Sequence, residues 1–243
     1  MFQIEIQSYC AHCLIAIGKV NAFRPEDIDA LDAQITQCER LFPDTLRAIS
    51  FESHGISPGG KKVFCAGADQ KIRADWSNAQ ILDYLMYQRQ VIHRLRLSPL
   101  GVISCVNGLA LGLGTEICLA SDIVLAGEDA AFGFPEKTWG IVPGAGGYAW
   151  AHGWAEHKEI AQQMIADGTP IDRERARFVG IADVLCDSED FGLLSNHFAA
   201  ELSKMTPEDQ IFRKNSRHEK IDYKNLFDEE QTAYCQSLKT RSR

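Results

Sequence analysis

The stretch VISCVNGLALGLGTEICLASDIV, residues 102–124, decides how this chain folds. Its apolar beginning predicts a buried strand that ends at the turn-forming pair Asn107-Gly108. A glycine-rich bend then leads into a short helix from about Gly114, and residues 123–126 predict the next strand. Where a chain turns from strand into helix, the first N–H groups have no partner within the helix, and the helix dipole adds positive potential. The stretch therefore predicts an α/β fold with a position for negative charge at the bend.

Two glutamates accompany the glycine-rich segments. Glu116 falls in the first turn of the predicted helix, and Glu136 lies in FGFPEKTWGIVPGAGG, residues 132–147. VFCAGAD, residues 63–69, predicts a second turn with an exposed N–H group. Two such donors can hold an oxygen that gains negative charge, at about 2.7–4 kcal/mol of barrier per donor, and paired carboxylates can move protons. The pattern also leaves simpler alternatives open: a carboxylate at position 116 that only meets the helix dipole, worth about 0.3–1 kcal/mol, and an exposed turn residue at position 136.

The rest of the chain predicts one α/β domain with a helical C-terminal part. Alternating apolar residues predict two strands near the start of the chain, and residues 63–65 predict another. Apolar residues at helical spacing predict helices over residues 26–42, 81–95, 157–166, 172–178 and 191–204. From Thr206 onward the sequence is highly charged and carries only scattered apolar anchors.

Composition argues against several classes of partner. The 243 residues carry a formal charge of -8, whereas nucleic acids and anionic membranes are bound by basic surfaces. An anionic ligand would therefore be captured locally, for which the candidates are Lys61, Lys62, Lys71 and Arg73. The alternative is that these four residues form a solvated basic patch. No apolar run reaches transmembrane length, and the first residues lack the pattern of a secretory signal.

The eight cysteines lie in apolar stretches, which predicts reduced, buried thiols in a cytoplasmic protein. Cys10 and Cys13 have the C-x-x-C spacing of a metal or redox pair. The segment that follows Cys13 has the pattern of a strand, on which residues three apart face opposite sides. We therefore predict no metal site.

The three glycine-rich segments resemble, in the same order and at similar separations, those of the crotonase (enoyl-CoA hydratase/isomerase) superfamily. The resemblance covers roughly residues 10–185. It implies a spiral of repeated β-β-α units over residues 1–190 and a helical C-terminal segment, 191–243, of the same domain that serves trimerisation or acts as a lid. It also implies a homo-oligomer, a trimer or a dimer of trimers. The substrate would be a coenzyme A thioester, with no tightly bound cofactor.

The resemblance assigns roles to individual residues. The backbone N–H groups of Ala68 and Leu113 would form the oxyanion hole. Glu116 would help to activate the water that adds at the β-carbon, and Glu136 would deliver or remove the proton at the α-carbon. Further substrate-binding positions would be Ala66, Asp69, Gln70, Lys71 and Gly112.

Three departures from the family pattern bear on function. Leu113 stands where the family has a small residue, Tyr148-Ala149-Trp150 replaces a polar run, and the chain stops soon after Tyr234, which predicts that the last helix of many relatives is missing. The expected activity is that of a lyase in fatty acid metabolism, which reversibly adds water to a 2-enoyl-CoA through an enolate. The alternatives are a Δ3-Δ2 enoyl-CoA isomerase, another crotonase-like acyl-CoA enzyme, or an acyl-CoA binding protein with impaired catalysis.

Overall fold

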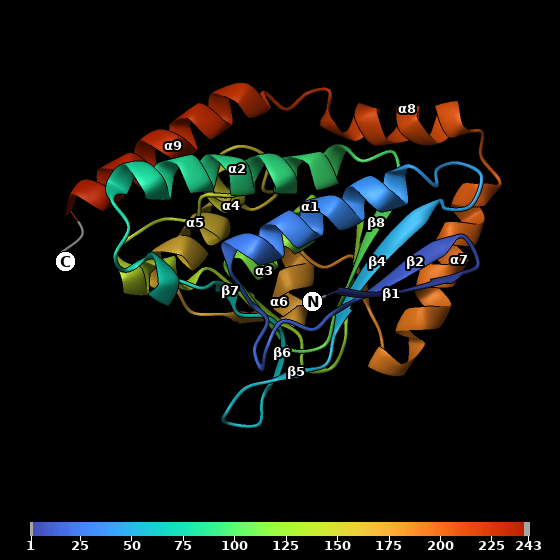
Figure 1. Cartoon of the computed structure of the whole chain (residues 1–243), viewed down its shortest axis with the longest axis horizontal. Helices are drawn as coiled ribbons and strands as arrows, with labels where there is room; N and C mark the ends of the chain where they lie inside the picture. The colour runs from blue at the N-terminus through green and yellow to red at the C-terminus, as the bar shows by residue number, and fades with distance from the viewer. Residues whose placement is uncertain (1, 241–243) are drawn as a thin grey trace.

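The computed structural model describes residues 2–240, which form two main β-sheets enclosed by helices (Figure 1). The larger sheet has six strands in the order β1 (Phe2–Gln7), β2 (Cys10–Ile15), β4 (Ala48–Ser53), β8 (Gly101–Val106), β10 (Ile123–Ala126) and β13 (Val184–Leu185). The smaller sheet has the order β12 (Ile171–Asp172), β11 (Ala131–Gly133), β9 (Leu109–Leu111), β6 (Lys62–Cys65) and β5 (Gly55–Ile56). A short third sheet pairs β3 (Ala22–Phe23) with β7 (Gly67–Ala68).

The chain repeats one unit as it passes between the sheets. β4, β8 and β10 lie in the larger sheet, and each is followed by a strand of the smaller sheet and then by a helix. Neighbouring strands of successive units are parallel, as in the pairing of Ile49 with Val102 and of Ile103 with Ile123. The predicted spiral of β-β-α units is therefore confirmed.

The helices are α1 (Pro25–Glu39), α2 (Asn78–Leu97), α3 (Leu113–Ala120), α4 (Gly147–His152), α5 (Lys158–Asp167), α6 (Arg173–Phe178), α7 (Phe191–Ser203), α8 (Pro207–His218) and α9 (Tyr223–Thr240). Six of the helices (α1, α2, α3, α5, α6 and α7) lie where the sequence predicts helices, and α4, α8 and α9 are additional. Three short 3-10 helices are η1 (Lys71–Arg73), η2 (Pro135–Trp139) and η3 (Ser188–Asp190). Local signals set the ends: Ser77 caps α2 through its hydroxyl, and Gly168, at φ 71°, ends α5.

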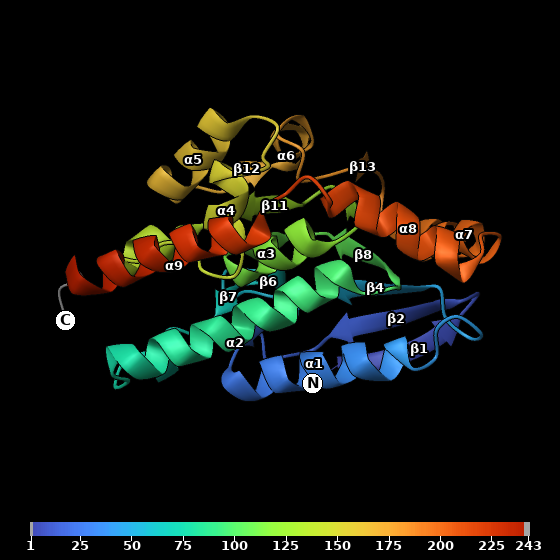
Figure 2. The same cartoon turned by 90° about the horizontal axis from the view of Figure 1, so that it is seen from above.

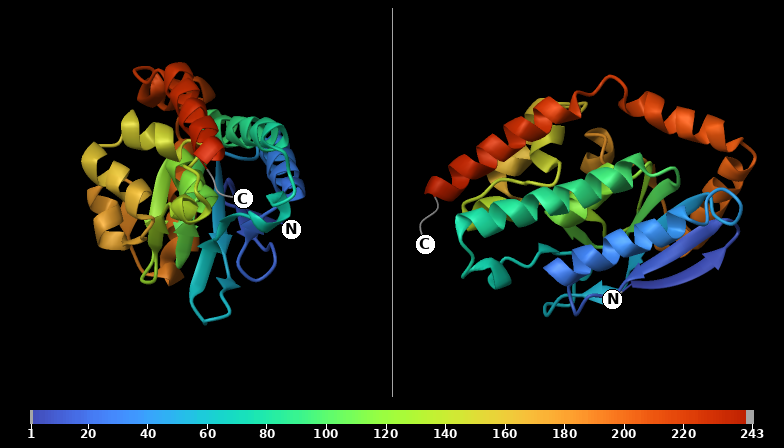
Figure 3. Two further views of the ribbon diagram at one scale, coloured as in Figure 1. Left: turned by 90° about the vertical axis from the view of Figure 1, so that its left-hand side faces the viewer. Right: turned by 45° about the horizontal axis from the view of Figure 1, so that its top comes forward.

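Helices cover both sides of the sheets. Figure 2 shows α1, α2 and α9 side by side, with α5 and α6 at the opposite side of the strands, and Figure 3 shows the same arrangement end-on. α7 covers the other face of the larger sheet, where Phe191 and Leu202 pack with Cys10. Cys13 packs instead in the main core. The prediction that Cys10 and Cys13 face opposite sides of a strand is confirmed.

The charged segment after Thr206 contains a helix whose bounds the sequence pattern does not predict. α9 is an 18-residue helix at the end of the described chain, and its Tyr234 and Leu238 pack against Ile81 and Leu85 of α2. The highly charged sequence hides this helix, because its apolar stripe is narrow and its other faces are polar. Among residues 2–240, no helix is long and apolar enough to cross a membrane.

Candidate active site

Glu116 is held by the loop that follows η2. It lies in the first turn of α3 and is 2% exposed. Its Oε1 accepts hydrogen bonds from the backbone N–H groups of Ala145 (2.7 Å) and Gly147 (3.0 Å). The second glycine-rich segment, PGAGG, therefore positions a carboxylate that the first glycine-rich segment supplies.

Glu136 reaches the same place from η2. Gly112, the residue before α3, has φ 52°, and a Cβ added there would collide with Oε1 of Glu136. Position 112 therefore requires glycine for two reasons: its backbone has a positive φ, and the Glu136 carboxylate approaches it closely. Glu136 as a whole residue is half-buried, yet its Oε2 is buried without a hydrogen-bond partner. Because this carboxylate oxygen is buried, the alternative that position 136 is only an exposed turn residue is wrong.

The two carboxylates differ in their environments. Burial and, to a smaller extent, the nearby charge of Glu116 together raise the pKa of Glu136 to about 8. Burial also raises the pKa of Glu116, but the N–H donors of Gly147 and Ala145 and the charges of Arg89 and Arg73 act in the opposite direction. Burial thus disfavours the ionised form of both carboxylates, and at Glu116 two N–H donors and two positive charges oppose this effect.

The backbones of Ala68 and Leu113 come together beside these carboxylates. Gly67, at φ 93°, precedes Ala68, and a Cβ added to Gly67 would lie 3.6 Å from the Leu113 nitrogen. Leu113 is the first residue of α3, so its N–H has no partner within the helix. The positive φ of the bend falls on Gly112 and not on Leu113, so the leucine meets no backbone strain there.

The Leu113 side chain is 2% exposed and belongs to the main core. We expect Leu113→Ala to lower the free energy of unfolding by about 2–5 kcal/mol and to keep the backbone N–H in place. Ile117→Ala, one turn further along α3 and equally buried, is the matched control. Urea unfolding together with kcat of the folded protein checks this expectation. It is wrong if Leu113→Ala alone abolishes turnover while Ile117→Ala does not.

The other predicted substrate-binding residues lie on the turn between β7 and η1 or next to it. Ala66 donates its N–H to Val20 O at 3.0 Å, and Asp69 Oδ1 accepts from the Lys71 backbone N–H at 3.0 Å. The Lys71 side chain is exposed, and Gln70 precedes η1. Ala66, Asp69, Gln70 and Lys71 therefore lie on the same short segment as Ala68, whereas Gly112 lies against the Glu136 carboxylate.

The alternative of a solvated basic patch that balances nearby acids fits Lys62, which pairs with exposed Asp129 at 2.9 Å. It does not fit Arg73, which is only 3% exposed and whose guanidinium lies over the Tyr84 ring, 4.5 Å from the ring centroid. Its place inside the protein was not expected from the sequence.

Two more functional residues were missed by the sequence analysis. Glu230 of α9 is 0% exposed, and its carboxylate accepts from the N–H groups of Gly146 (3.1 Å) and Ala149 (3.0 Å). Arg89 Nε lies 2.9 Å from Glu230 Oε1. Glu116 and Glu230 therefore accept hydrogen bonds from different N–H groups of the same segment, residues 145–149. Helical spacing could have found both residues, since Arg89 is four positions after Leu85 and Glu230 four before Tyr234, which are the buried neighbours on their helices.

Buried polar atoms without a hydrogen-bond partner gather around Glu116 in the described part of the chain. They are Arg73 Nε, Tyr84 Oη, Arg89 Nη2 and Glu136 Oε2. Arg73, Arg89 and Glu136 act electrostatically on Glu116, and Tyr84 touches Arg73. Buried polar groups are normally satisfied, so such a cluster marks a place built to meet a polar ligand.

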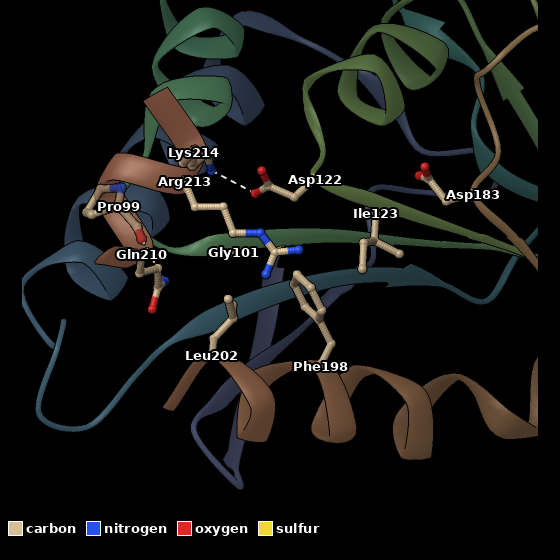
Figure 4. A pocket seen from close by; sticks show the side chains of 10 residues that line it. All are labelled: Pro99, Gly101, Asp122, Ile123, Asp183, Phe198, Leu202, Gln210, Arg213 and Lys214. Atoms are coloured by element: carbon tan, nitrogen blue, oxygen red, sulfur yellow. Dashed lines mark hydrogen bonds and ion pairs between the residues drawn. The ribbon is translucent and has the colours of Figure 1, made fainter. Parts of the chain in front are cut away.

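A separate pocket of about 230 Å³ lies beyond the other end of α3, next to α7 and α8 (Figure 4). Lys214 and Asp122 form an ion pair of 2.8 Å at its wall, and Arg213 extends into it near Phe198. Its lining includes none of the predicted site residues among those described. The pocket is therefore distinct from the glutamate site.

Comparisons with known proteins identify the family of this chain. The family model for enoyl-CoA hydratase/isomerase matches residues 16–237. The chain is 36% identical over 151 residues to the 2,3-dehydroadipyl-CoA hydratase of Escherichia coli, covering 62% of this chain and 56% of that protein. It is 32% identical over 145 residues to the enoyl-CoA isomerase/hydratase fer4 of Mycosarcoma maydis, covering 59% and 53%. The chain spans about half the length of these curated relatives.

The fold is also that of solved structures. A probable enoyl-CoA hydratase from Mycobacterium smegmatis superposes with a TM-score of 0.84 at 20% identity, over 98% of this chain and 95% of that chain. At this identity the likeness shows the crotonase fold alone. Together with the family match over most of the sequence, it shows that the chain belongs to the enoyl-CoA hydratase/isomerase family of the crotonase superfamily.

Proposed function

We propose that this protein is an enoyl-CoA hydratase-type lyase that reversibly adds water to a 2-enoyl-CoA thioester. The observation that carries the proposal is the pair of buried carboxylates, Glu116 and Glu136. Backbone N–H donors and two arginine charges act in favour of the ionised form of Glu116, whereas the charge of Glu116 acts in favour of the neutral form of Glu136. A hydration needs a base that takes a proton from water and an acid that gives a proton to carbon. A binding protein would have no use for such a pair.

The proposed reaction follows from the positions of these groups. The thioester oxygen accepts hydrogen bonds from the backbone N–H groups of Ala68 and Leu113. Ionised Glu116 takes a proton from water as the water oxygen bonds to the β-carbon, and the double-bond electrons move onto the thioester oxygen to give an enolate. Neutral Glu136 then gives its proton to the α-carbon. The proton now on Glu116 passes to Glu136, which restores the starting state.

The protonation state predicts the pH dependence. Hydration needs one proton shared by the two carboxylates, and this proton is lost when pH rises through the Glu136 pKa of about 8. We therefore expect kcat/KM to fall above about pH 8. No net proton enters the overall reaction, so its equilibrium constant is independent of pH, and the dehydration profile must have the same shape. Initial rates in both directions, measured across this range, check the prediction.

The same measurement separates the second candidate, a Δ3-Δ2 isomerase, which one relative's name includes. In an isomerase that uses Glu136 alone as the base, the ionised carboxylate abstracts the α-proton, so activity would rise through about pH 8. A rising profile therefore contradicts the hydratase proposal. The basic test of turnover is loss of the conjugated enoyl-thioester absorbance when the protein is added to crotonyl-CoA.

A further inference from the structure

Arg73 is a buried cation without an acid in contact. It is 3% exposed, its Nη2 donates to Gln88 Oε1 at 2.9 Å, and its Nε has no partner. Among residues 2–240, no carboxylate lies within ion-pair distance of its guanidinium. Buried charges are normally paired, because taking a charge out of water is costly. Arg89, on the same helix as Gln88, shows the usual solution, with Glu230 at 2.9 Å.

Tyr84 adds a second unused donor beside Arg73. Its ring lies under the guanidinium at 4.5 Å and meets Trp76 edge-on, with 5.5 Å between ring centroids. Its hydroxyl is buried and has no partner. Burial, the largest influence, raises the pKa of Tyr84 to about 12, although the charge of Arg73 opposes the rise. The hydroxyl is therefore a neutral donor, and an N–H and an O–H group are both available next to one positive charge.

Arg73 follows the proposed oxyanion-hole residue closely in the chain and lies within electrostatic reach of Glu116. η1, which ends with Arg73, begins three residues after Ala68, the proposed oxyanion-hole residue. The positive charge of Arg73 also acts on the Glu116 carboxylate. An acyl chain whose thioester oxygen lies at Ala68 and whose first carbons lie at the glutamates would therefore extend toward Arg73.

We propose that Arg73 and Tyr84 form a subsite for a carboxylate at the far end of the acyl group, so that the preferred substrates are 2-enoyl-CoA thioesters with a carboxylate-bearing acyl chain. This inference rests on the proposed function. A carboxylate would supply acceptor oxygens for the Arg73 N–H and the Tyr84 O–H groups and a negative charge to balance the guanidinium. An apolar acyl end would leave both donors without an acceptor and the buried charge without a counter-charge.

The test compares matched substrates. A series of 2-enoyl-CoA thioesters of increasing chain length is prepared in two forms, one ending in a methyl group and one in a carboxylate, and kcat/KM is measured for each. For the chain length that fits, wild type should prefer the carboxylate form. Arg73→Met should reduce the ratio of the two kcat/KM values by about 10–100-fold, the range for a charge-assisted hydrogen bond. Tyr84→Phe, which removes only a hydroxyl, should reduce the ratio by about 3–10-fold.

Arg96→Met is the matched control. Arg96 is also buried on α2, at 4% exposed, and its Nε also lacks a partner, but its guanidinium lies 4.9 Å from the Trp154 ring centroid and 5.5 Å from that of Tyr223. It should change thermal stability and leave the substrate ratio as it is. A preference of wild type for methyl ends, or an unchanged ratio in folded Tyr84→Phe and Arg73→Met, overturns the subsite alone. Absence of turnover with every substrate overturns the proposed function and the subsite with it.

Discussion

Replacement of Glu136 by glutamine is expected to lower kcat by about 10²–10⁴-fold, the contribution typical of a positioned acid or base. The amide has nearly the same size as the carboxylic acid and can keep its place against Gly112, but it cannot give a proton to carbon. Glu116→Gln is expected to cause a loss of similar size. Its amide oxygen can still accept from Ala145 and Gly147, so the loop should stay in place. Steady-state kinetics and acyl-CoA binding, measured for each variant, check both expectations.

The double variant distinguishes a joint mechanism from two separate effects. If Glu116 and Glu136 share one water and one proton, the second substitution should add little to the first, as for residues that act as a unit. Acyl-CoA binding should remain within a few-fold of wild type in all three variants. Full hydratase activity in Glu136→Gln contradicts the assignment. Loss in Glu136→Gln with none in Glu116→Gln favours the isomerase.

Glu230→Ala is expected to lower the free energy of unfolding by about 3–5 kcal/mol, the usual effect of removing one member of a buried ion pair. The substitution leaves the Arg89 guanidinium buried without its carboxylate and removes the acceptor of the Gly146 and Ala149 N–H groups. Because the same loop binds Glu116, kcat should fall as well. Urea unfolding at neutral pH measures the stability change.

Glu229→Ala is the control for this prediction. Glu229 is the exposed neighbour of Glu230, and its carboxylate accepts a hydrogen bond from the Asn225 side chain, at 2.9 Å, within α9. Its loss should change stability by no more than about 0.5 kcal/mol. Glu230→Gln, which keeps an acceptor oxygen but no charge, should lie between the two. A loss below about 1 kcal/mol in Glu230→Ala would show that α9 does not anchor the loop.

Local patterns in the sequence predict most of the fold. The spacing of Ile81, Leu85 and Ile92 identifies α2, and the glycines around Glu116 identify the bend into α3. The structure also brings Glu116 close to Glu136 and Gly67 close to Leu113. The helix and the bend are encoded within short segments, so their recognition does not require knowledge of tertiary contacts, whereas the meeting of the three segments is an expectation from the family resemblance.

The remaining features depend on contacts between distant segments. The helical spacing of Glu230 from Tyr234 indicates the packed face of α9, but the pairing of Glu230 with Arg89 depends on how α9 packs on α2. Arg73 follows two exposed residues of η1, and the sequence alone gives no sign that Tyr84 covers it. The formation of a trimer or of a dimer of trimers stays a prediction, because it concerns contacts outside the single chain.

The addition of water to carbon is the central claim, and isotope labelling tests it most directly. The protein is incubated in ¹⁸O-labelled water with crotonyl-CoA and with a 2-enoyl-CoA that ends in a carboxylate, and the products are analysed by mass spectrometry. The account predicts a 3-hydroxyacyl-CoA that is heavier by one labelled water, formed in a reaction that Glu136→Gln abolishes. A product of unchanged mass with a displaced double bond, or no product from either substrate, would contradict it.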